Sequence, residues 1–146
     1  MTSDFYILGT FVGSELERQT GEDLTPQIFK KFVWNLKEGD ELVLHVNSCG
    51  GDVYSGISIA NMLRELNQKG VVTTAVVEGL AASIASVVVC ACKKIKMYES
   101  SFVMLHNCWS VVQGNSDQLR KEADVMDKIN QAIKSFYHGH FNLSDE

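Results

Sequence analysis

Apolar residues along the chain follow two alternating periods, which predicts strands and helices in turn. Short apolar runs of strand length cover 5–8, 41–46, 71–77, 94–97 and 102–105. Apolar residues spaced three or four apart, or small and apolar throughout, predict helices over 26–36, 53–67 and 83–91. This alternation predicts βαβ units with right-handed crossovers and a mainly parallel sheet.

The pattern changes after His106. Residues 109–114 form a short extended run, and a long amphipathic helix begins at Ser116. Its apolar positions, three or four residues apart, are Leu119, Ala123, Met126, Ile129, Ile133 and Phe136. The sheet-forming runs all come earlier in the chain, so this helix is expected to project from the sheet domain.

One serine lies where an expected strand meets an expected helix. Gly79-Leu-Ala-Ala-Ser83 follows the strand 71–77, and a helix-compatible run follows the serine directly. Unpaired backbone N–H groups and the positive end of the helix dipole meet in a first helical turn, so an oxyanion formed there would be stabilised. The plainer alternative is that Ser83 only caps a buried helix.

Two further strand ends carry polar chemistry. Gly50-Gly51 follow the strand 41–46 and leave backbone N–H groups uncovered by side chains. His106 follows the strand 102–105, and an imidazole can take the proton of a serine hydroxyl. In a parallel sheet these ends meet at one edge, where open α/β folds place their sites. An ordinary turn and a structural histidine are the plainer alternatives.

Other serines and histidines fit the pattern less well. Ser86 lies one turn after Ser83, inside the expected helix, which predicts that its hydroxyl points at the backbone carbonyl four residues before it. His45 lies in the middle of the strand 41–46 and is expected to be structural.

Composition is that of an ordinary globular protein of one domain, with 146 residues of which 45% are hydrophobic and 21% charged. No apolar stretch has the length of a membrane span, and Met1-Thr-Ser-Asp4 lacks the features of a signal peptide, so we expect a cytoplasmic protein with no membrane partner. The formal net charge of −5 argues against nucleic acid as the main partner. The four cysteines lack metal-binding spacing and are expected to be free thiols.

Three sequence blocks together resemble a known family. They are Asn47-Ser-Cys-Gly-Gly-Asp-Val-Tyr-Ser-Gly56, Gly79-Leu-Ala-Ala-Ser83 and Met104-Leu-His-Asn107. They resemble the proteolytic subunit of the Clp protease, and most closely the Clp-like prohead (head maturation) proteases of phages and prophages. The likeness runs from about Phe5 to the last residue. It implies the Clp/crotonase-like spiral of βαβ units in a single domain 1–146, with a head of roughly 1–107 and a protruding strand-helix handle of roughly 108–140.

The resemblance also implies a serine endopeptidase that cleaves peptide bonds through an acyl-enzyme. Ser83 would be the nucleophile, and His106 the general base and then the general acid. The backbone N–H of Ile84 would be one oxyanion donor, and the second would come from Gly50 or Gly51, of which Gly50 is favoured. This chemistry requires no metal and no organic cofactor.

The chain departs from the family pattern in two places. Cys49 stands where the family usually has proline. The family's third catalytic residue, an acid, normally lies well beyond the histidine, whereas this chain stops at Glu146, so we expect a C-terminal truncation. The third acid stays unassigned, because the remaining carboxylates do not match it in sequence context: Asp117, Asp124, Asp127 and Asp145. A Ser-His pair without its acid loses ~10⁴ in turnover, so a weak catalyst is expected.

The family's handle joins subunits into rings, so a homo-oligomeric ring formed through 111–138 is expected. The substrate would be a polypeptide, capsid or scaffold protein in a head maturation role, and an ATPase partner is left open. Two alternatives remain. A catalytically inactive ring subunit would fit the absent acid. A crotonase-type acyl-CoA enzyme, more distant, would need a glutamate or aspartate near the oxyanion hole and an adenine pocket.

Overall fold

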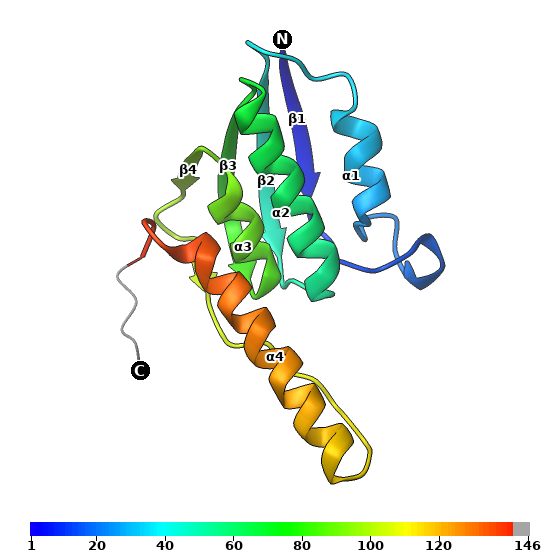
Figure 1. Ribbon diagram of the computed structural model, residues 1–146. Coiled ribbons are helices and arrows are strands. Elements are labelled where there is room, and N and C mark those ends of the chain that lie inside the picture. Colours follow the sequence, from blue (N-terminus) through cyan, green and yellow to red (C-terminus); the bar gives the residue numbers. More distant parts are fainter. Residues whose placement is uncertain (142–146) are drawn as a thin grey trace. The chain divides into compact units, whose positions relative to one another are not determined.

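The computed structural model describes residues 1–141 as two compact units, divided between Leu105 and His106. The first unit holds the sheet and the helices that pack on it (Figure 1). Its elements are β1 (Thr2–Ile7), the 3-10 helix η1 (Glu15–Glu17), α1 (Pro26–Val33), β2 (Glu41–Ser48), α2 (Val53–Gln68), β3 (Val72–Ala82), α3 (Ile84–Ala91), β4 (Lys94–Met97) and β5 (Phe102–Met104). The second unit contains α4 (Ser116–Tyr137).

All paired strands are parallel, and neighbours follow the order of the chain, β1-β2-β3-β4. β4 and β5 pair with the same edge of β3, one after the other: β4 pairs with Thr74–Val77 and β5 with Leu80–Ala82. When successive strands are neighbours and every crossover has the same hand, the connecting helices fall on one face of the sheet. Accordingly, α1, α2 and α3 lie on the same side of the strands (Figure 1).

Alternate residues of the long strands are buried on this helix side and form the core. The fully buried side chains include Leu42, Leu44, Val46, Val77, Ile59, Leu63, Val87 and Val88. Burying one such side chain contributes about 1.5–3 kcal/mol. Every residue of α3 is buried, which explains why its sequence is apolar on all sides instead of amphipathic. The start of α3 is therefore fixed by packing all around it.

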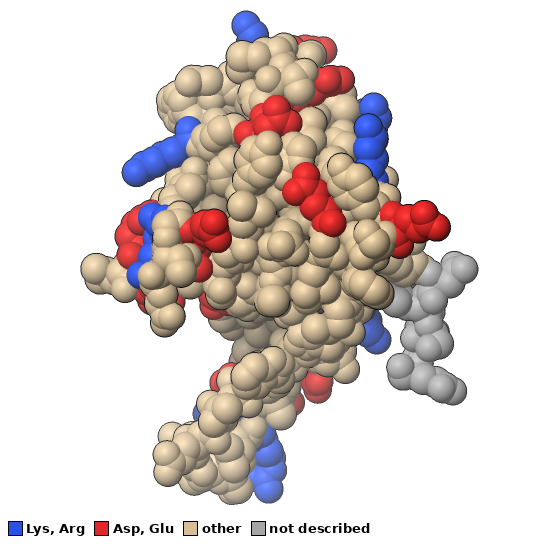
Figure 2. Space-filling model, turned by 180° about the vertical axis from the view of Figure 1, so that it is seen from behind, with Lys and Arg blue, Asp and Glu red and all other residues tan. Residues whose placement is uncertain are grey.

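The opposite side of the sheet carries a polar cluster across three strands. His45 of β2 lies between Asp4 of β1 and Glu78 of β3, with Nε2–Oδ1 and Nδ1–Oε1 distances of 3.0 and 2.7 Å. The ring also stacks on Tyr6, with centroids 4.5 Å apart. Figure 2 shows this side as largely uncharged, with a few acidic side chains toward its middle. His45 therefore has the structural role expected from its place in the strand.

We predict that His45 stabilises the sheet more at acidic than at alkaline pH. Both ring nitrogens face carboxylates, so only the imidazolium donates to both. The hydrogen bond to Asp4, reinforced by Glu78, raises the pKa of His45 against the opposing effect of burial. A raised folded-state pKa gives stability that is full below the unfolded value of about 6.5 and is lost as pH rises through the folded value.

Thermal unfolding of His45→Gln and wild type at pH 6 and pH 9 checks this expectation. The wild type is expected to have the higher Tm, and the difference in Tm between wild type and His45→Gln is expected to be larger at pH 6 than at pH 9. His138→Gln, which alters an exposed histidine at the C-terminal end of α4, is the matched control. A gap for His45→Gln that widened toward pH 9 would contradict the role given to the imidazolium.

The predicted parallel α/β fold is confirmed, with local differences. β3 runs on to Ala82 instead of ending at Val77. Its pairing with β2 shifts register between Val46 and Ser48, where the Asn47 side chain accepts the Leu80 N–H (3.1 Å), and β5 pairs with the extended part of β3. α1 ends at Val33 instead of residue 36. η1 was not predicted, since none of its residues is buried and it has no apolar pattern. Residues 109–114, where an extended run was expected, are assigned no strand.

The second unit consists of an extended segment fastened to α4. Asn115 and Gln118 form a reciprocal capping box at the start of the helix. The Cys108 N–H donates to Asn130 Oδ1 at 2.8 Å, which ties the segment to the helix. The predicted apolar seam is only partly covered: Ile133 and Phe136 are buried, whereas Leu119 is 43% exposed.

No helix among the described residues combines the length and apolar character needed to cross a membrane. That this unit is an oligomerisation handle stays a prediction.

Candidate active site

The glycine turn after β2 is clamped by the backbone of Phe11. The Phe11 N–H donates to Gly50 O at 3.0 Å, and the Asp52 N–H donates to Phe11 O at 2.8 Å. Gly50 and Gly51 have φ angles of 96° and 145°, in the region that favours glycine. A Cβ on Gly51 would overlap the Phe11 carbonyl oxygen. The two glycines therefore allow an approach of two backbones that side chains would block.

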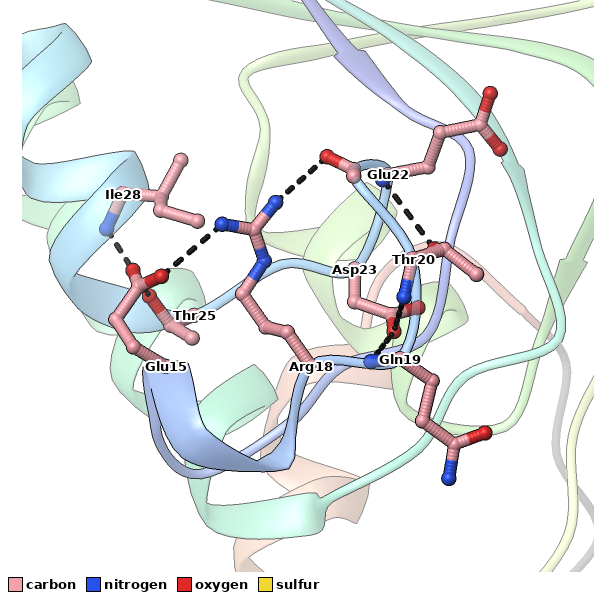
Figure 3. A network of polar contacts seen from close by, with 9 residues as sticks. Glu15, Arg18, Gln19, Thr20, Glu22, Asp23, Thr25 and Ile28 are labelled. Atoms are coloured by element: carbon pink, nitrogen blue, oxygen red, sulfur yellow. Dashed lines mark hydrogen bonds and ion pairs between the residues drawn. The ribbon is translucent and has the colours of Figure 1, made fainter.

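The segment that holds Phe11 is organised by one carboxylate (Figure 3). Asp23 accepts the backbone N–H groups of Thr10, Gln19 and Thr20 at 3.1, 2.8 and 2.9 Å. Leu24 then pairs with the same stretch, its N–H donating to Thr10 O at 2.9 Å. Because Thr10 precedes Phe11, the Asp23 network fixes the strand-like piece that clamps the glycine turn.

We predict that Asp23→Asn is destabilised at neutral pH and that the difference from wild type disappears in acid. Hydrogen bonds from the backbone of Thr20, Thr10 and Gln19 lower the pKa of Asp23 to about 2. A depressed folded-state pKa gives stability that is present above the unfolded value of about 4 and is lost as pH falls toward the folded value. An amide also presents an N–H₂ group to at least one backbone donor.

Unfolding curves between pH 7 and pH 2 measure this effect. Glu22→Gln is the control, because this neighbouring carboxylate extends away from the network (Figure 3). An Asp23→Asn penalty that stayed constant down to pH 2 would contradict a role for the ionised carboxylate.

Ser83 occupies a strained position between β3 and α3. Its φ and ψ are 55° and −129°, and it is the only non-glycine residue with positive φ in the described part of the chain. Such backbone strain costs about 1–3 kcal/mol and clusters at functional sites. The side chain makes no capping hydrogen bond, so helix capping does not account for the serine. In α/β-hydrolases a sharp strand-to-helix turn of this kind exposes a nucleophilic hydroxyl.

The glycine turn and the serine turn meet. A Cβ built on Gly50 would lie 2.8 Å from Ser83 Cβ and 3.2 Å from the Ile84 nitrogen. A Cβ on Gly56 of α2 would overlap the Ile84 side chain, so a second glycine allows α3 to pack this closely. The Ser83 N–H also donates to Met104 O of β5 at 2.9 Å. Three of the predicted site residues, Gly50, Ser83 and Ile84, are thus brought together.

The two glycine amides differ in their availability. The Gly50 N–H is buried and donates to Ser48 Oγ at 3.1 Å, so it is already occupied; which of the two glycines would donate to an oxyanion stays a prediction. Gly51 is the bridge partner of Phe11, and in a parallel bridge the flanking residues bond the partner while the central N–H points away. Among the described residues the Gly51 N–H has no hydrogen-bond partner. The Ile84 N–H, at the first position of α3, has no intrahelical acceptor.

His106 is exposed and begins the second unit, two residues after Met104. Its Nδ1 lies 2.5 Å from the carbonyl oxygen of Asn107. A carbonyl only accepts, so Nδ1 donates, and in the neutral ring the lone pair is then on Nε2, which is the tautomer that a general base of this kind uses. The pairing of this ring with Ser83 stays a prediction.

The remaining candidates fall outside the site or are engaged. The Ser86 hydroxyl is buried and donates to Ser83 O at 2.5 Å, a backbone carbonyl three residues back instead of the predicted one four residues back. Cys49 is exposed in the glycine turn, whereas burial raises the pKa of Cys90 and of Cys92 to about 12. Asp117 forms an exposed ion pair with Arg120, and Asp145 lies outside the described residues. No group of three or more His, Cys, Asp or Glu side chains within residues 1–141 is placed to hold a metal ion.

A parallel sheet covered by helices on one face, with a strained serine and a double glycine at its carboxyl edge, defines a mixed α/β protein of the Clp/crotonase-like class. The sequence comparison is more specific. Residues 8–146 match the family model described as Clp protease, so this chain belongs to the Clp protease family.

Curated relatives agree with this membership. The chain is 30% identical over 138 residues to the ATP-dependent Clp protease proteolytic subunit of Deinococcus radiodurans, which covers 93% of this chain and 65% of the relative. It is 25% identical over 136 residues to the subunit of the same name from Bacteroides fragilis, with 92% and 63% covered. The subunit of Carsonella ruddii is 34% identical over 106 residues, with 71% and 53% covered. The chain thus spans less than two thirds of the length of these relatives.

Proposed function

We propose that this chain is a serine endopeptidase of the Clp type that cleaves polypeptides through an acyl-enzyme. The observation that carries the proposal is the junction of Ser83, strained and uncapped, with the Gly50-Gly51 turn and the free amide of Ile84. Backbone strain at a residue that makes no stabilising cap is expected where the fold must hold a reactive side chain in a fixed orientation. Membership of the Clp protease family supports the same chemistry.

In the proposed mechanism the Ser83 hydroxyl attacks a peptide carbonyl while Nε2 of His106 takes its proton. The N–H groups of Gly51 and Ile84 donate to the oxyanion of the tetrahedral intermediate. His106 then gives the proton to the leaving amine, and a water molecule hydrolyses the acyl-enzyme by the same steps in reverse. Each amide donor contributes about 3–4 kcal/mol to the transition state in comparable sites. No step uses a metal or an organic cofactor.

The biological setting is part of the proposal. The likeness of the three motifs to prohead proteases favours head maturation, with capsid or scaffold protein as substrate and the host cytoplasm or the assembling head as location. The relatives named above are called ATP-dependent subunits, which keeps an ATPase partner as the other possibility. Oligomerisation through 111–138 is supported by the exposed apolar side chains of the second unit, where Val111 is 89% and Leu119 is 43% exposed.

A second candidate function is a ring-forming subunit without activity. One observation favours it: Nδ1 of His106 faces the Asn107 carbonyl, which carries no charge, where a serine protease triad has a carboxylate. A carbonyl fixes the tautomer but stabilises the imidazolium less. This candidate keeps the fold and the oligomer and differs only in rate.

Labelling with a fluorophosphonate, followed by mass spectrometry of the labelled peptide, tests the proposal. The probe is expected to modify Ser83 in the wild type and in Ser86→Ala, and to react far more slowly with His106→Ala. Ser86→Ala is the matched control, since it removes a neighbouring hydroxyl that the mechanism does not use. A wild type that resists the probe while remaining folded would favour the inactive subunit.

A further inference from the structure

The hydroxyl of Ser48, at the end of β2, bonds two backbone segments at once. It donates to the carbonyl of Gly9 at 2.7 Å and accepts the Gly50 N–H at 3.1 Å. The residue is 4% exposed, so neither bond has water as a ready substitute. Removing the hydroxyl would leave the buried Gly50 amide and the partly buried Gly9 carbonyl without this partner.

These two bonds fix the orientation of the glycine turn. With its N–H on Ser48 and its carbonyl on the Phe11 N–H, both backbone groups of Gly50 are satisfied on the side of the Gly9–Phe11 segment. Ser48 thus holds the peptide between Cys49 and Gly50, and Phe11 holds the peptide between Gly50 and Gly51, which carries the Gly51 N–H. The Gly51 N–H is then left as the uncommitted amide of the turn.

The requirement for a fixed orientation comes from the glycines themselves. Two consecutive residues at φ 96° and 145° have a wide range of accessible backbone conformations, so the two peptides of the turn could rotate and re-aim their N–H groups unless both were held. Cys49 at the preceding position does not restrict φ as a proline would. A side-chain acceptor on the Gly50 amide supplies the missing restraint.

We propose that Ser48 is a positioning residue of the oxyanion hole, which holds the Gly50 amide so that the Gly51 amide is presented to the substrate carbonyl beside that of Ile84. This inference rests on the proposed serine peptidase function for its kinetic consequence. Its structural part, the occupation of the Gly50 amide, stands independently of activity.

The kinetic test compares Ser48→Ala, Ser48→Thr and Ser55→Ala. Misplacing one oxyanion donor costs roughly 10²-fold in rate in comparable sites, so Ser48→Ala is expected to lose about that factor in kcat for peptide or ester substrates with little change in KM. Ser48→Thr retains a hydroxyl and is expected to recover most of the rate. Ser55→Ala is the matched control, because Ser55 is buried to a similar degree and its hydroxyl lies 2.6 Å from Asp52 Oδ2 and 3.0 Å from Val12 O, next to the same segment, without bonding Gly50.

The structural test uses amide hydrogen exchange by NMR on the folded wild type and the same variants. The Gly50 amide is expected to be protected, and to exchange at least tenfold faster in Ser48→Ala but not in Ser55→Ala. An unchanged Gly50 exchange rate in Ser48→Ala would overturn the inference whether or not the protein is active. The two proposals can fail separately. If the Gly50 amide exchanges faster in Ser48→Ala but the wild type is not labelled by a fluorophosphonate, the inference on the turn stands and the proposed peptidase function is rejected.

Equal kcat losses in Ser48→Ala and Ser55→Ala would also overturn it, since they would show a general loosening of the segment instead of control of one amide.

Discussion

The Ser83→Gly variant is expected to lose all fluorophosphonate labelling and yet to be more stable than Ser83→Ala. Loss of the nucleophile of a serine protease costs about 10⁶ in kcat, so both variants should be inactive. Their stabilities should differ because position 83 has φ 55° and ψ −129°, where glycine avoids the strain of a Cβ. After allowing for the larger entropy of an unfolded glycine, the gain is about 1 kcal/mol.

Urea unfolding of the two variants measures this difference without any contribution from the hydroxyl. Ser86→Gly compared with Ser86→Ala is the control at a regular helical position, where glycine should be less stable by about 1 kcal/mol. If glycine proved the less stable residue at both positions, the strain assigned to Ser83 would be absent. The nucleophile would then lie in a relaxed turn, and the main structural argument for the peptidase would fail.

Gly50→Ala is expected to remove activity and to destabilise the fold strongly. The new Cβ would lie 2.8 Å from both the Ala82 carbonyl oxygen and Ser83 Cβ, and the residue would keep a φ of 96°. Backbone strain and overpacking at a site that cannot yield are each of order 1–3 kcal/mol, so a loss of about 4 kcal/mol is expected. Any molecule that folds should hold the glycine turn and Ser83 too far apart for catalysis.

Gly39→Ala is the matched control, because Gly39 also has a positive φ, 86°, but a Cβ there would meet no atom within 4 Å. It should lose only the conformational part, about 1 kcal/mol, and retain full labelling. Equal losses of stability in the two variants would contradict the close approach of the glycine turn to Ser83. The comparison separates backbone conformation from packing.

The sequence predicted the fold well because the strands of this sheet lie in chain order and a helical pattern separates most successive strands. Alternation of strand and helix patterns then determines the topology with little ambiguity. The candidate site was predictable in part: Gly50, Ser83 and Ile84 do come together at the end of the sheet.

The choice of the oxyanion amide was not predictable from the motif. It depends on a hydrogen bond between Ser48 and Gly50 and on a bridge between Phe11 and Gly51, which lie far apart in sequence. The role of Asp23 was missed for a related reason. Its three backbone donors lie in a loop without periodicity, and only the three-dimensional path of that loop shows why a carboxylate is needed.

β3 is the strand from which the rest of the first unit takes its alignment. It pairs with β2 along one edge and with β4 and then β5 along the other. A slip of one residue on either edge would turn every side chain of the partner strand to the wrong face. A slip of β2 would displace the glycine turn. A slip of β5 would displace the Met104 carbonyl, which accepts the Ser83 N–H. Correct pairing of β3 along both of its edges is therefore a condition for bringing the glycine turn, Ser83 and the Met104 carbonyl together.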